Sequence, residues 1–158
     1  MIRKALPKDM DGVYLMGRDV WGKGQKISDY LADCRSSLKY KQGEWFLLED
    51  AELEAVSSLI VYRLPPDDAG IGSIASAPKK RRKGFAAQLI RSVLEALDAR
   101  HMRAIYLFSD IPPRYYDEFG FKALPSEYQM HPGSTCMIRS ASIAAILKAD
   151  GFRPPPYF

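Results

Sequence analysis

The sequence predicts a mixed α/β fold, and two patterns carry that prediction. Apolar segments of strand length, joined by short polar turns, fill the first half and are typical of antiparallel hairpins. A strand–helix–strand unit follows in the middle of the chain. The 158 residues suit a single domain with a substantial core. We therefore expect one domain over residues 1–151 and a Pro-rich tail over residues 152–158.

The first half should contain two helices and four strands. Pro7 is placed to open a helix that carries Val13 and Val20. Ser28 is a candidate N-cap for a second helix from residue 29 to about 40, with Leu38 near its apolar face. The expected strands span residues 2–6, 45–48, 56–64 and 70–77.

The helix after Gly84 is the best-specified element. From Phe85 to about Arg100, polar and apolar residues separate into two faces at helical spacing. The polar face is Gln88, Arg91, Glu95 and Asp98, and the buried face is Ala86, Leu89, Ile90, Val93 and Leu97.

The remaining elements are short. A buried strand is expected over residues 103–108, and Asp110 is placed to cap a short helix with Pro112 and Pro113 in its first turn. A strand begins near Gly120, and the last strand should lie at residues 136–138. Ser140 should start a C-terminal helix that stops at Gly151.

Several classes of protein are disfavoured by what the sequence lacks. No apolar stretch approaches membrane-spanning length, and the N-terminal residues lack the apolar core of a signal peptide. Cys34 and Cys136 are far apart and are expected to be free thiols in a reducing cytoplasm. With only His101 and His131, a His-rich metal site is not expected. We expect a cytoplasmic protein with no metal and no membrane partner.

Positive charge is concentrated in residues 79–83, which read Lys-Lys-Arg-Arg-Lys. The whole chain has a net charge of +4, but without these five cations 18 Lys and Arg face 19 Asp and Glu, a net charge of −1. Such local excess disfavours a uniformly basic nucleic-acid surface and favours one compact anionic partner.

The position of this run suggests an anion cradle. It lies between an apolar strand and the Phe85 helix, and Gly84 would let the backbone approach a ligand closely. The free N–H groups that open a helix, with its dipole, favour phosphate. A solvated turn and a nuclear import signal are the alternatives for the same residues. No Walker-type phosphate loop and no Gly-x-Gly-x-x-Gly motif occurs.

Two motifs in order resemble those of the GNAT family, the Gcn5-related N-acetyltransferases. Arg81-Arg82-Lys83-Gly84-Phe85-Ala86 matches the Gln/Arg-x-x-Gly-x-Gly/Ala motif, and Tyr115-Tyr116-Asp117-Glu118-Phe119-Gly120-Phe121 matches the aromatic–Tyr–x–x–x–Gly–Phe motif. One helix and one strand separate them, as in the family. The resemblance covers residues 45–123 and implies a mostly antiparallel sheet flanked by helices, with a splayed central strand pair.

The resemblance also implies a set of site residues. Backbone groups of the strand at Ile74, Ala75 and Ser76 would contact the pantetheine arm of acetyl-CoA, and the next strand, ending at Ser109, would splay away to admit the thioester. Tyr116 corresponds to the general acid of the family. Tyr115 is one residue out of register with that position and is expected to have a structural role. The pyrophosphate would be bound by Arg81, Arg82, Lys83, Gly84, Phe85 and Ala86.

The function that this resemblance implies is an acyl-CoA-dependent N-acyltransferase that moves an acetyl group to a primary amine by direct attack in a ternary complex. The acceptor would be a small molecule or a peptide, and a homodimer stays open. For the general base, Asp67, Asp68, Asp110 and a water chain are alternatives, because Gly70 stands where many relatives have Glu. The alternative functions are a non-catalytic acetyl-CoA-binding regulatory module and a nucleic-acid binder that uses residues 79–83.

Overall fold

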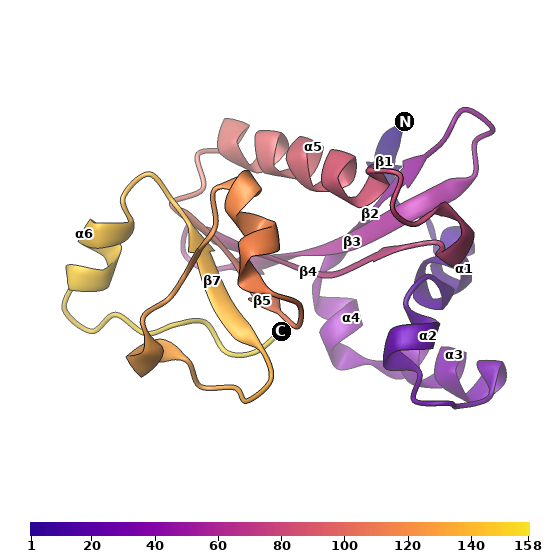
Figure 1. The fold of residues 1–158 in the computed structure, drawn as a ribbon, viewed down its shortest axis with the longest axis horizontal. Coiled ribbons are helices and arrows are strands. Elements are labelled where there is room, and N and C mark those ends of the chain that lie inside the picture. The colour runs from indigo at the N-terminus through magenta and orange to yellow at the C-terminus, as the bar shows by residue number, and fades with distance from the viewer. The chain divides into compact units, whose positions relative to one another are not determined.

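The computed structural model describes residues 1–158 and has the predicted mixed α/β fold (Figure 1). Seven strands form one sheet in the order β1-β2-β3-β4-β5-β7-β6. The β1–β2, β2–β3, β5–β7 and β6–β7 pairs are antiparallel, and β4–β5 is parallel. The strands are β1 (Ile2–Lys4), β2 (Glu44–Glu49), β3 (Ala55–Leu64), β4 (Asp68–Ser76), β5 (Ala104–Ser109), β6 (Lys122–Ala123) and β7 (Thr135–Arg139).

The helices are mostly short. The longest is α5 (Phe85–Ala99), and its predicted apolar face is buried at Leu89, Ile90, Val93 and Leu97. The other α-helices are α1 (Met10–Leu15), α2 (Arg18–Trp21), α3 (Ile27–Ser36), α4 (Leu38–Gln42) and α6 (Ile143–Lys148). The 3₁₀ helices are η1 (Pro7–Asp9), η2 (Pro78–Lys80), η3 (Pro113–Phe119) and η4 (Ser126–Tyr128). None of the helices combines the length and the apolar character that a membrane crossing requires.

The chain divides into two compact units, which we describe separately. Unit 1 contains Met1–Tyr62 and Ser73–Glu95, and unit 2 contains Arg63–Gly72 and Ala96–Phe158. Three elements, β3, β4 and α5, run from one unit into the other. In β4 the change of unit falls at Ser73, whose φ of 46° interrupts the extended backbone.

The core of unit 1 is formed by the β2 and β3 strands and by the first part of α5. Its fully buried side chains include Leu47, Leu59, Ile60, Leu89 and Ile90. β2 pairs with β3 from Glu44–Val61 to Leu48–Ser57 before the register shifts at Glu49. The strands predicted for this part of the chain are therefore confirmed, with ends within two residues of the expected positions.

The two helices predicted before residue 41 are each broken, which corrects the sequence prediction. The first divides into η1, α1 and α2, with Gly17 between the last two because a Cβ there would lie 2.1 Å from the Trp21 ring. The second divides at Ser37, whose extended backbone ends α3 and whose hydroxyl accepts a hydrogen bond from the Tyr40 N–H at 3.3 Å. As a result Leu38 is 74% exposed, and α3 begins at Ile27 without a Ser28 cap.

In unit 2, the parallel ladder between β4 and β5 is short. It pairs Asp68 with Ala104 and ends where Gly70 pairs with Tyr106, whereas β5 pairs with β7 as far as Ser109. The strands therefore part after three residue pairs, as expected for the splayed pair. Two bidentate ion pairs stabilise this unit: Arg103 with Asp68 at 2.5 and 2.9 Å, and Arg139 with Asp98 at 2.6 and 2.8 Å.

Two predicted helix starts in unit 2 are also wrong. Asp110 does not cap the short helix, because η3 begins at Pro113 with Pro112 as its N-cap and no side-chain cap bond. Ser140 lies three residues before α6 and instead accepts a hydrogen bond from the Ser142 N–H through its hydroxyl. No pattern in the sequence indicates that a 3₁₀ helix forms after the two prolines in place of an α-helix.

The tail over residues 152–158 packs against the rest of unit 2. Phe152 and Phe158 lie against a cluster of buried residues that includes Tyr106 and Ile138. The Tyr128 and Phe152 rings are 4.9 Å apart, and the Phe108 and Phe158 rings are 5.1 Å apart. These contacts fix the tail against the face of β5 that carries Phe108.

Candidate functional site

The predicted anion cradle lies in unit 1, where β4 ends and α5 begins. The connection passes through η2 and then through two left-handed residues, Arg82 with a φ of 61° and Gly84 with a φ of 80°. The Gly84 carbonyl accepts the hydrogen bond of the Gln88 N–H at 2.9 Å, so the N–H groups of residues 85–87 have no partner inside the helix. A Cβ on Gly84 would meet no heavy atom within 4 Å. The helix thus opens toward free space with unused donors.

The end of β4 has one edge paired and one edge facing away from β3. The Ala77 N–H donates to the Val56 carbonyl at 3.0 Å, and the Ala75 carbonyl accepts from the Ser57 hydroxyl at 2.8 Å. Because backbone groups alternate between the two edges of a strand, those of Ile74 and Ser76 face the other edge. That edge is the one that can hydrogen-bond an extended ligand.

Two of the five cations in the basic run are engaged inside the protein. The Lys80 ammonium lies 2.8 Å from Asp50, 3.4 Å from Glu54 and 3.7 Å from Glu52. It therefore occupies the centre of an acidic triad that could otherwise hold a metal ion. The Lys80 ammonium also holds the pKa of Asp50 below its usual range.

The Arg81 side chain also forms its hydrogen bonds within the protein. Its guanidinium donates to both carboxylate oxygens of Asp19 at 2.6 and 2.7 Å, to the Met16 carbonyl at 3.0 Å and to the Ser76 carbonyl at 3.2 Å. This pairing lowers the pKa of Asp19. The side chain thus ties the loop to the end of β4 and to α2. The three other cations, Lys79, Arg82 and Lys83, are exposed and form no ion pair.

Tyr116 lies on η3 in unit 2 and is buried, with 7% of its surface exposed. Its ring contacts those of Tyr115 at 5.0 Å, Phe121 at 6.2 Å and Phe119 at 6.3 Å. Burial, with smaller contributions from Tyr115 and Asp110, raises the pKa of Tyr116 to about 12. The phenol therefore keeps its proton throughout the physiological pH range. Ser109, also in unit 2, donates its hydroxyl to the Ile111 carbonyl at 2.7 Å.

Two of the positions considered for a general base are already occupied. The Asp68 carboxylate forms the bidentate ion pair with Arg103. At Gly70 a Cβ would lie 2.4 Å from the Phe158 ring, so the ring takes the space of a side chain there. Asp67 and Asp110 are exposed, so these two carboxylates and a water chain to bulk solvent stay as the alternatives for the base.

Substituting Gly70 by alanine should destabilise unit 2, because the new methyl group overlaps the Phe158 ring. Overpacking of this kind costs about 1–3 kcal/mol. We expect a fall in Tm of about 2–4 °C for each kcal/mol. Differential scanning calorimetry of Gly70→Ala, Phe158→Ala and the double variant measures it. The double variant should lose less than the sum of the two single losses, and full additivity would contradict the contact.

The structure places the predicted site residues in two groups. Unit 1 brings together Ile74, Ala75, Ser76, Arg81, Arg82, Lys83, Gly84, Phe85 and Ala86 around the start of α5, and unit 2 holds Ser109 and Tyr116. Sequence reasoning missed Asp19 and Asp50, which engage the Arg81 and Lys80 side chains. They lie 62 and 30 residues from their partners, and no local pattern in the sequence marks such a pairing.

Residues 67–124 match the family model described as an acetyltransferase (GNAT) domain. No match was found among curated protein sequences. The chain is similar in structure to a GNAT family N-acetyltransferase (YhbS) from Escherichia coli solved in complex with CoA, with 20% identity, 98% of this chain and 86% of that chain covered, and a TM-score of 0.67.

Two further solved structures have similar folds. The PaiA N-acetyltransferase from Thermoplasma acidophilum, in complex with coenzyme A, is 12% identical, with 89% of this chain and 98% of that chain covered and a TM-score of 0.68. A chimera of the spermidine N-acetyltransferase SpeG from Vibrio cholerae and hSSAT is 17% identical, with 92% of this chain and 98% of that chain covered and a TM-score of 0.67. The resemblance to the GNAT family is therefore confirmed, by the matched segment and by the fold.

Proposed function

We propose that this protein transfers the acetyl group of acetyl-CoA to a primary amine by direct attack in a ternary complex. The observation that carries the proposal is the opening of α5, where unused N–H groups and an unobstructed Gly84 face free space beside three exposed cations. A diphosphate ester fits this combination, because it can accept several backbone hydrogen bonds at a helix N-terminus. CoA-bound structures with the same fold support the choice of coenzyme.

The residues around the cradle would share the work of binding. The N–H groups of residues 82–86 would bind the pyrophosphate, with the charges of Arg82 and Lys83 beside it. The Ile74 backbone groups and the Ser76 N–H would hydrogen-bond the pantetheine arm, while the Ser76 carbonyl accepts from Arg81. Arg81 would act mainly by holding the loop in shape, since its donors are directed at Asp19 and at two carbonyls. Ser109 would lie near the thioester.

The proposed chemistry follows from the two pKa values involved. The amine nitrogen attacks the thioester carbonyl, the carbon–sulfur bond breaks, and the departing sulfur gains negative charge. A thiol has a pKa of about 8.5, whereas burial raises the pKa of Tyr116 to about 12. Complete proton transfer from the phenol to a free thiolate is therefore uphill. Tyr116 would act as the acid by donating a strong hydrogen bond to the sulfur as the charge develops, and the departed thiolate would then take its proton from solvent.

Direct attack fits better than a covalent acetyl-enzyme. Cys34 and Cys136 are both buried, and burial raises the pKa of each thiol, that of Cys136 to about 12. Neither is therefore available as a thiolate nucleophile near neutral pH. An ammonium acceptor must lose its proton before attack. Asp67, Asp110 or a water chain would take that proton.

Calorimetry with CoA, followed by measurement of thiol release from acetyl-CoA with an amine panel, tests the proposal. The panel should include peptide amines and polyamines, as spermidine is named for one structure of the same fold. We expect CoA binding and amine-dependent release. CoA binding without release for any amine would favour a regulatory module. Binding to RNA or DNA with steep salt dependence, unaffected by excess CoA, would favour a nucleic-acid binder.

Replacing Asp19 by asparagine tests the positioning role of Arg81. If charge alone mattered, loss of an anion near the loop would strengthen CoA binding. We instead expect the Kd for CoA to rise about three- to fivefold, because the loop loses an exposed bidentate ion pair that helps to fix its shape. Isothermal titration calorimetry measures the change.

The matched control is Asp11→Asn, which breaks a similarly exposed ion pair with Arg35 elsewhere in unit 1. Its Kd for CoA should stay within about twofold of the wild type, since α1 and α3 contribute nothing to the cradle. Tighter CoA binding by Asp19→Asn would contradict the positioning role.

A further inference from the structure

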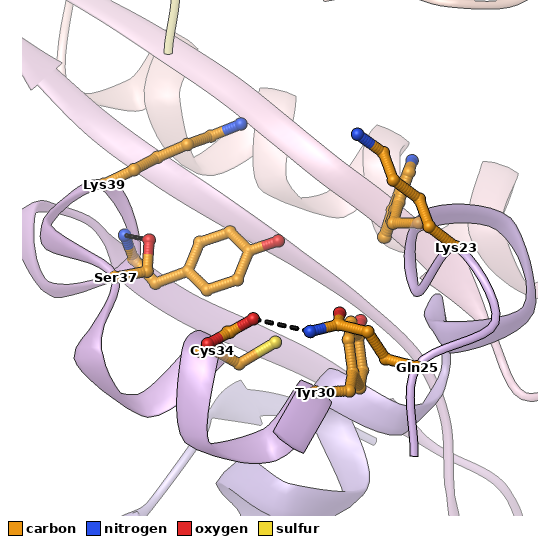
Figure 2. Close-up of a pocket in the computed structure, with 9 residues that line it drawn as sticks. Lys23, Gln25, Tyr30, Cys34, Ser37 and Lys39 are labelled. Carbon is orange, nitrogen blue, oxygen red and sulfur yellow. Dashed lines mark hydrogen bonds between the residues drawn. The ribbon is translucent and has the colours of Figure 1, made fainter. Parts of the chain in front are cut away.

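A separate pocket lies in unit 1, between the turn that follows α2 and the helices α3 and α4. Its volume is about 490 Å³, within the range of small-molecule sites. Figure 2 shows the side chains that line it. None of the residues assigned to the anion cradle contributes to its wall.

The aromatic walls of this pocket are held in place by contacts behind them. The Trp21 ring fills the space left by the missing side chain of Gly17. The Tyr40 ring stacks on Tyr14 at 5.6 Å and meets Trp45 edge-on at 5.2 Å. A ligand would therefore find flat apolar surfaces already formed, which reduces the entropy lost on binding.

Two lysine side chains bring positive charge to the aromatic walls of the pocket. Figure 2 shows the Lys23 and Lys39 side chains extending toward one another from the two ends of the pocket. Lys23 lies in a left-handed turn with a φ of 48° and forms no ion pair, and the Lys39 ammonium lies 5.9 Å from the centre of the Tyr40 ring. A single carboxylate, Asp33, lines the pocket, and it already accepts a hydrogen bond from the Gln25 amide at 2.7 Å.

We propose that this pocket binds a small organic carboxylate. The ligand's carboxylate lies between the ammonium groups of Lys23 and Lys39, and its apolar body lies against the Trp21 and Tyr40 rings. Two ammonium groups directed over flat aromatic rings match a carboxylate that is attached to an apolar body. The buried thiol of Cys34 in the wall is neutral, because burial raises its pKa, and adds no negative charge. This site is independent of the proposed acetyl transfer.

The test uses one set of probes that differ in their apolar body and a second set that differ in their charged group. Acetate, hexanoate and hydrocinnamate are titrated against the full chain by saturation-transfer NMR and tryptophan fluorescence, beside hydrocinnamamide, phenylpropylamine and inorganic phosphate. We expect hydrocinnamate to bind best and at least about tenfold more tightly than its amide, the effect of one charge-assisted contact. A carboxylate series that does not bind at about 10 mM, or an amide, amine or phosphate that binds as well as hydrocinnamate, would overturn the proposal.

Substitutions locate the binding. Lys23→Met and Lys39→Met should each weaken hydrocinnamate binding about tenfold. Lys41→Met is the matched control, because Lys41 lies on α4 beside Lys39 but is outside the pocket lining. An equal loss in the Lys41 variant would show a general charge effect and contradict the site. Repeating the titration with saturating CoA should leave the Kd unchanged, so this result stands even if the proposed acetyl transfer fails.

Discussion

Replacement of Tyr116 by phenylalanine should lower kcat about 100- to 10,000-fold, the range that a positioned general acid contributes. The Kd for CoA should stay within about twofold, because the phenol would act at the sulfur and not at the pyrophosphate. The ring and its packing against Phe119 and Phe121 are retained, so the fold should not change. Thiol release at saturating acceptor, with calorimetry for CoA, measures both quantities.

The pH dependence of kcat gives a second test of the same role. Burial raises the pKa of Tyr116 to about 12, so the acid stays protonated up to about pH 10. Tyr116 should therefore cause no fall in kcat between pH 7 and about pH 10. A loss of activity on that limb in the wild type but not in Tyr116→Phe would show that the phenol titrates lower and would contradict the assigned environment.

Tyr115→Phe is the control for this substitution. It removes the same hydroxyl from the neighbouring ring on η3, which is 38% exposed. We expect its kcat to stay within about twofold of the wild type, because a surface substitution away from the chemistry has little effect. Loss of CoA affinity with unchanged kcat in Tyr116→Phe would reverse the assignment, since it would make Tyr116 a binding residue.

Replacement of Gly84 by leucine should abolish CoA binding while leaving a folded protein. The backbone at Gly84 has a φ of 80°, which costs a residue with a side chain about 1–2 kcal/mol. The new Cβ would lie in open space in the free protein, since no heavy atom lies within 4 Å of its position. It would instead occupy the space proposed for the pyrophosphate. Calorimetry with CoA and thermal unfolding together separate the two effects.

Gly151→Leu provides the matched control for backbone strain. Gly151 has a φ of 75°, and a Cβ there also meets nothing within 4 Å, but it lies in the turn after α6. Both variants should lose a similar amount of stability, and only Gly84→Leu should lose CoA binding. Retained CoA binding in Gly84→Leu would place the pyrophosphate elsewhere and remove the main support for the proposed function.

The predictions of secondary structure from the sequence were most accurate for elements that are determined by residues close together in the chain. The helix after Gly84 was predicted correctly because its apolar spacing is regular over fifteen residues. The strands were predicted to within two residues because their apolar runs are bounded by turns. The helix break at Ser37 was missed, since only a single extended residue separates two helical segments.

Other features could not be predicted because they depend on contacts between distant residues. No residue close to Arg81 in the sequence indicates that its guanidinium would pair with Asp19 and not point toward a ligand. The space that a Gly70 side chain would take is filled by the ring of Phe158, which lies 88 residues later in the sequence. Only the folding of the tail brings this ring to Gly70. The role of a residue within a motif thus depends on partners that the motif does not contain.

The ion pairs of Lys80 and Arg81 change how the basic run would respond to ionic strength. Of the five cations in the basic run, only three can displace counterions from a bound polyanion. These are Lys79, Arg82 and Lys83. If this loop bound duplex DNA, the logarithm of the affinity should fall with the logarithm of salt concentration with a slope no steeper than about −2.7. The loop would discriminate among anions by their shape more than by their total charge.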